Sequence, residues 1–153
     1  AALEELAKLK TIAKSPNADN YRVGATPASA VLQLAAFGLE GETLTAQGDL
    51  SGAIEAYRAG VAIEDQNNYT EPPDWAQPMR HYLGAALLKA DEPEAAEAVY
   101  RRDLQWNHNN GWSLFGLHQA LAAQNKQSEA SQVFKQWQKA WASADITLTA
   151  SHL

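Results

Sequence analysis

The sequence predicts an all-α protein of about seven helices, made of an N-terminal helix and three helix pairs. Apolar residues recur at steps of three and four along most of the chain, which is the spacing of one face of an α-helix. The same stretches are rich in alanine, leucine, glutamate, glutamine and lysine, which all favour helix. One pattern of small, apolar and aromatic residues occurs three times, and such repetition is typical of stacked helical units.

The N-terminal part of the chain is expected to hold one short helix and the start of a longer one. Leucines at helical spacing predict the first helix over Leu3–Lys14, and a proline soon afterwards ends it. Thr26 is expected to cap a long helix that runs to Gln47, with Pro27 in its first turn. Residues 1–33 are therefore interpreted as a diverged N-terminal element that precedes the first full repeat.

Three segments of the chain share one internal pattern. Each has a leucine three residues after its start, an alanine nine residues later and an aromatic residue four further on: Gly41–Tyr57, Gly84–Tyr100 and His118–Phe134. The alanines of the second and third segments are 34 residues apart, and those of the first and second are 43 apart. We expect repeats over residues 34–66, 78–110 and 111–142, a nine-residue insertion within a connector at 67–77, and a tail at 143–153.

Polar residues mark the turns inside these pairs. Asp49 is expected to cap the second helix of the first pair. Asp91 and Glu94 have the spacing of a capping box that opens the second helix of the next pair. In the third pair, the short sequence "QNK" is expected to turn the chain.

Two antiparallel helices joined by a tight turn place the first and last residues of each pattern opposite one another. The facing pairs are Gly41 with Tyr57, Gly84 with Tyr100, and His118 with Phe134. In the first two pairs a large residue meets a glycine, as close packing requires. The same register places Arg80 opposite Asp103, where we expect a charge pair.

Helix–turn–helix units with a 34-residue period resemble the tetratricopeptide repeat family. The matching residues include Leu83-Gly84, Ala96, Tyr100 and the "GD" at Gly48-Asp49, and the resemblance extends from about Leu34 to Trp141. It implies a single domain folded as a right-handed α-solenoid, a superhelix of stacked helix pairs. The sequences "EPPDW", "AEAVYRRDL" and "NGWSLFGL" also resemble the C-terminal part of bacterial tetratricopeptide proteins of unclear role.

The resemblance further implies a concave groove lined by the first helix of each pair, which binds a protein or peptide. In this chain the groove positions would be Gly38, Glu42, Thr45, His81, Tyr82, Ala85, Lys89, Trp112, Phe115, Gln119 and Ala122. From these positions we select His81, Tyr82, Lys89, Trp112, Phe115 and Gln119 as candidate partner-binding residues. Trp112 and Phe115 are equally well explained as core residues.

The connector contributes two further candidates, Tyr69 and Trp75. Three prolines in "NNYTEPPDWAQPMR" restrict its backbone, and Pro78 fits the first turn of the next helix. Because a stiff, aromatic insertion needs a surface to lie on, we expect Tyr69 and Trp75 to fold back onto the second repeat and wall one end of the groove near His81. The alternative is that Trp75 fills a gap between repeats.

Composition disfavours several classes of protein. The 153 residues include no cysteine and carry a formal charge of −6, which disfavours a nucleic-acid binder because such proteins need a clustered basic face. No apolar run is long enough for a membrane span, and no secretion signal is recognised, so we favour the cytoplasm.

Motifs for catalysis, metals and cofactors are not recognised. The four histidines lack the spacing of a metal site, and the sequence contains no P-loop, GxSxG or GxGxxG motif. The leading hypothesis is a non-catalytic module that binds a peptide or helical segment of a protein partner. The alternatives are a regulatory or substrate-recognition domain of a larger enzyme, and a structural unit that forms homo-oligomers through its open ends.

Overall fold

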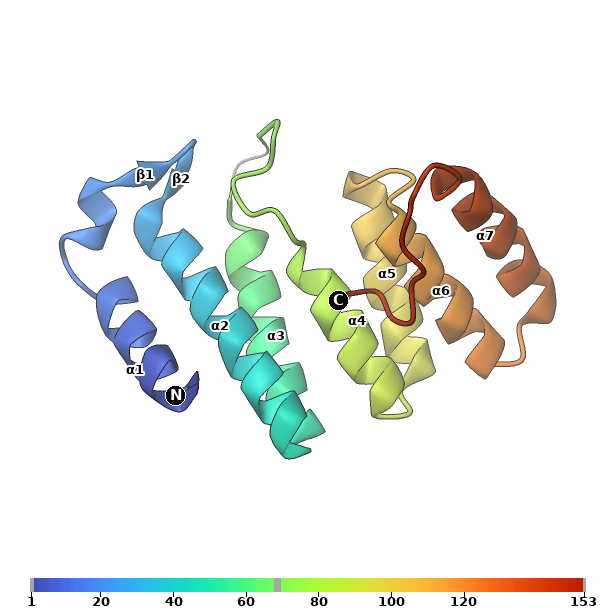
Figure 1. Cartoon of the computed structure of the whole chain (residues 1–153), viewed down its shortest axis with the longest axis horizontal. Coiled ribbons are helices and arrows are strands. Elements are labelled where there is room, and N and C mark those ends of the chain that lie inside the picture. Colours follow the sequence, from blue (N-terminus) through green and yellow to red (C-terminus); the bar gives the residue numbers. More distant parts are fainter. Residues whose placement is uncertain (1, 68–69, 153) are drawn as a thin grey trace. The chain divides into compact units, whose positions relative to one another are not determined.

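The computed structural model describes residues 2–67 and 70–152. Over these residues it contains seven α-helices, one 3₁₀ helix and a two-stranded hairpin (Figure 1). The all-α class and the seven helices confirm the sequence prediction. The chain divides into two compact units, Ala1–Met79 and Arg80–Leu153, and each is described by itself.

In the first unit, the long helix α2 packs against both α1 and α3. The elements are α1 (Ala2–Ala13), η1 (Ala18–Asn20), β1 (Arg22–Val23), β2 (Thr26–Pro27), α2 (Ala28–Gln47) and α3 (Leu50–Glu64). An ion pair of 2.6 Å between Lys10 and Glu40 links α1 to α2. The buried apolar residues include Leu6, Leu34 and Tyr57, so this core lies between the three helices.

The second unit contains α4 (Met79–Lys89, which begins at the boundary), α5 (Pro93–Trp106), α6 (Gly111–Ala123) and α7 (Gln127–Ala140). Here α6 packs against both α5 and α7. Leu87, Tyr100 and Leu121 are fully buried in its core. After α7, an irregular tail returns across the unit and ends beside α4 (Figure 1).

The same turn joins the two helices of every predicted pair. Gly48, Asp91 and Asn125 all have positive φ angles, of 83°, 60° and 59°. The residue after each one donates its N–H to a leucine carbonyl five positions back, over 3.0 Å to Leu44, 2.9 Å to Leu87 and 3.0 Å to Leu121. This is the bond of a Schellman turn. The three turns are spaced like the alanines of the sequence pattern, so the repeated sequence forms a repeated local structure.

Three of the predicted facing pairs are confirmed. A Cβ added to Gly41 would lie 2.2 Å from the Tyr57 ring, and one added to Gly84 would lie 2.3 Å from the Tyr100 ring. In the third pair, the rings of His118 and Phe134 have centroids 4.8 Å apart.

The predicted helix caps are right at Asp49 and wrong at two other places. The Asp49 carboxylate accepts the Gly52 N–H at 2.9 Å. Helix α5, however, is capped by Glu92 without a side-chain hydrogen bond, because Asp91 is used for the left-handed turn. Helix α2 starts after Pro27, which is itself the N-cap residue, and Thr26 belongs to the hairpin.

The predicted placement of Pro78 in a first turn is also displaced by one position, since α4 begins at Met79. The Met79 N–H is bonded to the Glu64 carboxylate at 3.0 Å. The Glu64 side chain therefore caps the start of α4. Among the helices in the described ranges, none is long and apolar enough to cross a membrane.

Candidate functional site

The C-terminal tail lies on the first helices of two neighbouring pairs. It leaves α7 through a turn in which the Trp141 indole N–H donates to the Ile146 carbonyl at 3.0 Å. Figure 1 shows it, in dark red, passing α6 and ending beside α4. Leu148 is 5% exposed and Ser151 is fully buried. A tail that buries these residues is a packed part of the unit.

Ser151 joins the tail to the interior through two short hydrogen bonds. Its hydroxyl donates to the backbone carbonyl of His81 on α4 at 2.8 Å. The Tyr100 hydroxyl on α5 lies 2.6 Å from the same oxygen and can supply the proton that Ser151 accepts. Burial raises the pKa of Tyr100 well above its ordinary value, so its hydroxyl keeps its proton at neutral pH.

Two glycines let the Tyr100 ring reach the tail. A Cβ on Gly84 of α4 or on Gly116 of α6 would lie 2.6 Å from the Tyr100 hydroxyl oxygen, and closer still to its ring. The ring therefore passes from α5 between α4 and α6, and its hydroxyl meets Ser151 beyond them. The sequence predicts Gly84 opposite Tyr100 but misses Gly116, whose only signal is a glycine within the apolar helix "GWSLFGL".

Two more contacts extend this surface. The Tyr82 ring stacks on His152, with centroids 5.0 Å apart and an interplanar angle of 27°. The Gln119 amide donates to the Thr149 carbonyl at 3.4 Å. We call the surface formed by His81, Tyr82, Tyr100 and Gln119 the tail face. Three of its four residues are among those that the sequence predicts for partner binding, and the structure brings these three together around the tail.

Other predicted site residues lie elsewhere. Trp112 packs edge-on against Trp141, with centroids 5.3 Å apart, and Phe115 packs against Trp137 at the same separation. Both are half-buried in an aromatic cluster between α6 and α7, where Trp137 lies on α7 and Trp141 is its C-cap residue. Their packing is that of half-buried core residues, and a role in partner binding stays a prediction.

Lys89 is exposed at the C-terminal end of α4. Trp75 is half-buried in the connector, and Tyr69 lies outside the described residues. The expected position of these two aromatic residues beside His81 stays a prediction.

The connector is anchored by Asp74, a residue that sequence reasoning missed. One oxygen of its carboxylate accepts the N–H groups of Ala25 and Thr26, both at 3.0 Å, and the Thr26 hydroxyl at 2.8 Å. These bonds lower the pKa of Asp74, with the Thr26 side chain as the largest cause. Position 24 requires glycine, because its φ is 57° and a Cβ there would collide with the Asp74 carboxylate. The connector is thus held to the hairpin of the first unit.

A buried carboxylate supports the His81 end of the tail face. Asp103 on α5 is 2% exposed and accepts hydrogen bonds from Ser113 at 2.6 Å and from Asn107 at 2.9 Å. Its other neighbour is the His81 ring, 3.4 Å away. Burial alone would raise the pKa of Asp103, but the contacts with His81, Ser113 and Asn107 outweigh it and hold that pKa below its ordinary value. The expected pairing of Asp103 with Arg80 stays a prediction.

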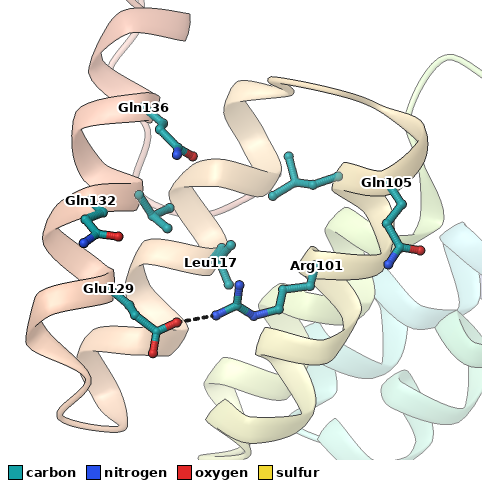
Figure 2. Close-up of a pocket in the computed structure, with 8 residues that line it drawn as sticks. Arg101, Gln105, Leu117, Glu129, Gln132 and Gln136 are labelled. Atoms are coloured by element: carbon teal, nitrogen blue, oxygen red, sulfur yellow. Dashed lines mark hydrogen bonds and ion pairs between the residues drawn. The ribbon is translucent and has the colours of Figure 1, made fainter.

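A hollow lies on the side of the second helices. It is an open cleft of about 450 Å³ between α5 and α7, with Leu117 of α6 beneath it (Figure 2). Three glutamine amides line its walls, and the ion pair of Arg101 with Glu129, 2.8 Å long, closes one end.

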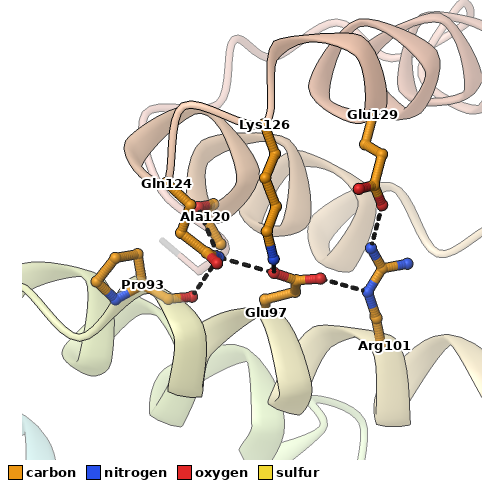
Figure 3. Close-up of polar contacts among 7 residues, drawn as sticks. All are labelled: Pro93, Glu97, Arg101, Ala120, Gln124, Lys126 and Glu129. Atoms are coloured by element: carbon orange, nitrogen blue, oxygen red, sulfur yellow. Dashed lines mark hydrogen bonds and ion pairs between the residues drawn. The ribbon is translucent and has the colours of Figure 1, made fainter.

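The same ion pair continues into a network around Glu97 (Figure 3). The Glu97 carboxylate is bonded to Lys126 at 2.7 Å, to Gln124 at 2.7 Å and to Arg101 at 2.8 Å. Burial alone would raise the pKa of Glu97, but these three partners lower it to about 2. The network ties α5 to the turn between α6 and α7, so its evident role is structural.

The described part of the chain contains no group of three His, Asp or Glu side chains placed to hold a metal ion. The tail face offers instead a paired hydroxyl and carbonyl, a ring for stacking and an amide. These groups suit the binding of a polypeptide segment. Comparisons with protein-family models, curated proteins and solved structures find no match.

Proposed function

We propose that this chain is a non-catalytic interaction module, and that the tail face binds a non-helical peptide segment of a protein partner. The observation that carries the proposal is the tail itself. An irregular segment already lies across α4 and α6, and its backbone carbonyl at Thr149 and its side chains at Ser151 and His152 find specific partners there.

The chemistry of the tail face also supports peptide binding. A stacking ring and an amide that donates to a backbone carbonyl recognise features common to many peptides, whereas the buried Tyr100–His81 pair selects one side chain. Interfaces of this kind rely on a few aromatic anchors. Tyr82, which is half-buried, is the aromatic anchor of this surface.

The tetratricopeptide resemblance extends the proposal to the whole chain. In a right-handed superhelix of three repeats, Lys89, Trp112 and Phe115 of the second unit would supply further contacts beside the tail face. The identical turns after Leu44, Leu87 and Leu121 support this reading, since a superhelix needs equivalent units.

The test is a screen of short peptides against the full chain, followed by affinity measurement by fluorescence anisotropy. Peptides that bind the tail face should lose at least tenfold in affinity for Tyr82→Ala and for Gln119→Ala. The matched control is Lys135→Ala, an exposed position on α7 that should bind as wild type does. If both variants keep wild-type affinity while remaining folded, the tail face is not the binding surface.

A further inference from the structure

The contacts of the tail define a ligand more closely than the proposed function does. Leu148 is buried, Ser151 follows three residues later, and the His152 ring comes next. These three side chains point to a short linear arrangement: an apolar residue, two others, a small hydroxyl residue and a planar ring.

The hydroxyl position is the selective one. A serine hydroxyl donates one hydrogen bond and accepts others, so it can satisfy the His81 carbonyl and the Tyr100 hydroxyl together. Alanine satisfies neither, and a carboxylate would oppose the carbonyl oxygen. Because Tyr100 is fully buried, a ligand that fails to engage its hydroxyl leaves a polar group unpaired, which is costly.

The two glycines make this position accessible to a ligand. Without them, side chains on α4 and α6 would separate the Tyr100 hydroxyl from the surface. The Tyr100 ring can pass between α4 and α6 only because both positions are glycine. The gap between Gly84 and Gly116 thus lets Tyr100 present its hydroxyl from the interior to whatever lies on the tail face.

We propose that residues Leu148–His152 are a built-in occupant of the tail face, and that its external ligand is a peptide with the same arrangement, which must displace the tail. This inference rests on the proposed function, since it names the ligand of the same surface. A tail attached by a short segment acts at an effective concentration of order millimolar. A free peptide therefore binds the intact chain more weakly than a chain whose tail has been released.

The experiment uses a fluorescent peptide with the tail sequence "DITLTASHL" and the full chain in three forms. Wild type is compared with Leu148→Asp, which places a charge at a buried apolar position, and with Ser151→Asp, which leaves Leu148 in place in case the first variant fails to fold. Anisotropy gives the affinities, and circular dichroism checks the helix content of each form.

We expect the released chains to bind the peptide at least tenfold more tightly than wild type does. The same peptide with the change Ser151→Ala should bind them at least tenfold more weakly, and adding Tyr82→Ala to either released chain should also weaken binding. Equal affinity for all three chains, or indifference to Ser151→Ala in the peptide, would overturn the inference.

Two further results separate this inference from its alternatives. If peptides from the screen bind through Tyr82 and Gln119 while the tail peptide does not bind, the ligand assignment fails and the proposed function stands. If light scattering shows a wild-type dimer that dissociates in Ser151→Asp, tails are exchanged between two copies, and the intramolecular occupant is ruled out.

Discussion

Replacing Gly116 by alanine should destabilise the second unit, although alanine is the better helix former. The new Cβ would lie 2.2, 2.5 and 2.6 Å from three atoms of Tyr100, which is about 1 Å inside the usual contact distance of about 3.5 Å. The ring has no room to retreat, because Gly84 on α4 lies against the same three atoms: a Cβ added there would be 2.3, 2.5 and 2.6 Å from them.

Two opposing effects set the size of the change. Overpacking of a core costs about 1–3 kcal/mol, and replacing glycine by alanine within a helix gains about 1 kcal/mol. We place the overpacking near its upper end because Tyr100 is rigid and enclosed on both sides. The expected net loss is about 2 kcal/mol in the free energy of unfolding, together with a weakened Tyr100–Ser151 hydrogen bond.

The assay is urea unfolding followed by tryptophan fluorescence, because four of the five tryptophans lie in the second unit. The matched control is Gly38→Ala on α2, where the added Cβ meets nothing within 4 Å. This variant should be stabilised by up to about 1 kcal/mol, as seen by circular dichroism. In a double-mutant cycle, Tyr100→Leu should remove most of the penalty at Gly116. The close packing of Tyr100 between Gly84 and Gly116 is refuted if Gly116→Ala is as stable as wild type, or if its penalty is unchanged in the Tyr100→Leu background.

Four further changes test other parts of the structure. Since the pKa of Glu97 is lowered to about 2, its contribution to stability is complete above its unfolded pKa of about 4.5 and is lost as the pH falls toward 2. Glu97→Gln should therefore be less stable at pH 7 and lose less on acidification, whereas the exposed Glu94→Gln should follow wild type in urea titrations at pH 7 and 3. Asp103→Asn should lower the free energy of unfolding by about 1–3 kcal/mol at neutral pH, and a melting temperature equal to that of wild type would contradict its assigned contacts. Asp74→Ala should release the β1–β2 hairpin, seen as faster amide hydrogen exchange there, and unchanged exchange would show that the connector is held by other contacts. Asp49→Ala should cost about 1 kcal/mol through loss of a helix cap, measured by thermal unfolding, and no change would mean that water replaces the cap.

Local signals in the sequence were sufficient for the helices and for the layers within each pair. Helical periodicity and turn residues act over a few positions, so they predict elements such as α2 and the turns at Gly48 and Asn125. The register between paired helices also follows from sequence, because a short turn leaves only one way to align Gly84 with Tyr100. The predicted caps at Thr26 and Asp91 are wrong because Thr26 belongs to the β1–β2 hairpin and Asp91 forms the left-handed turn before α5.

The sequence by itself determined the all-α class and the helix pairs, and it singled out His81, Tyr82 and Gln119 on α4 and α6 as candidate binding positions. Only the tertiary structure decided that the tail covers these positions, since Ser151 and His81 are 70 residues apart and an irregular segment carries no periodic signal. The same holds for Asp74 and Thr26, which are 48 residues apart. A contact of this kind depends on where the folded helices place a carbonyl, a hydroxyl and a ring in space, and those positions exist only once the chain has packed.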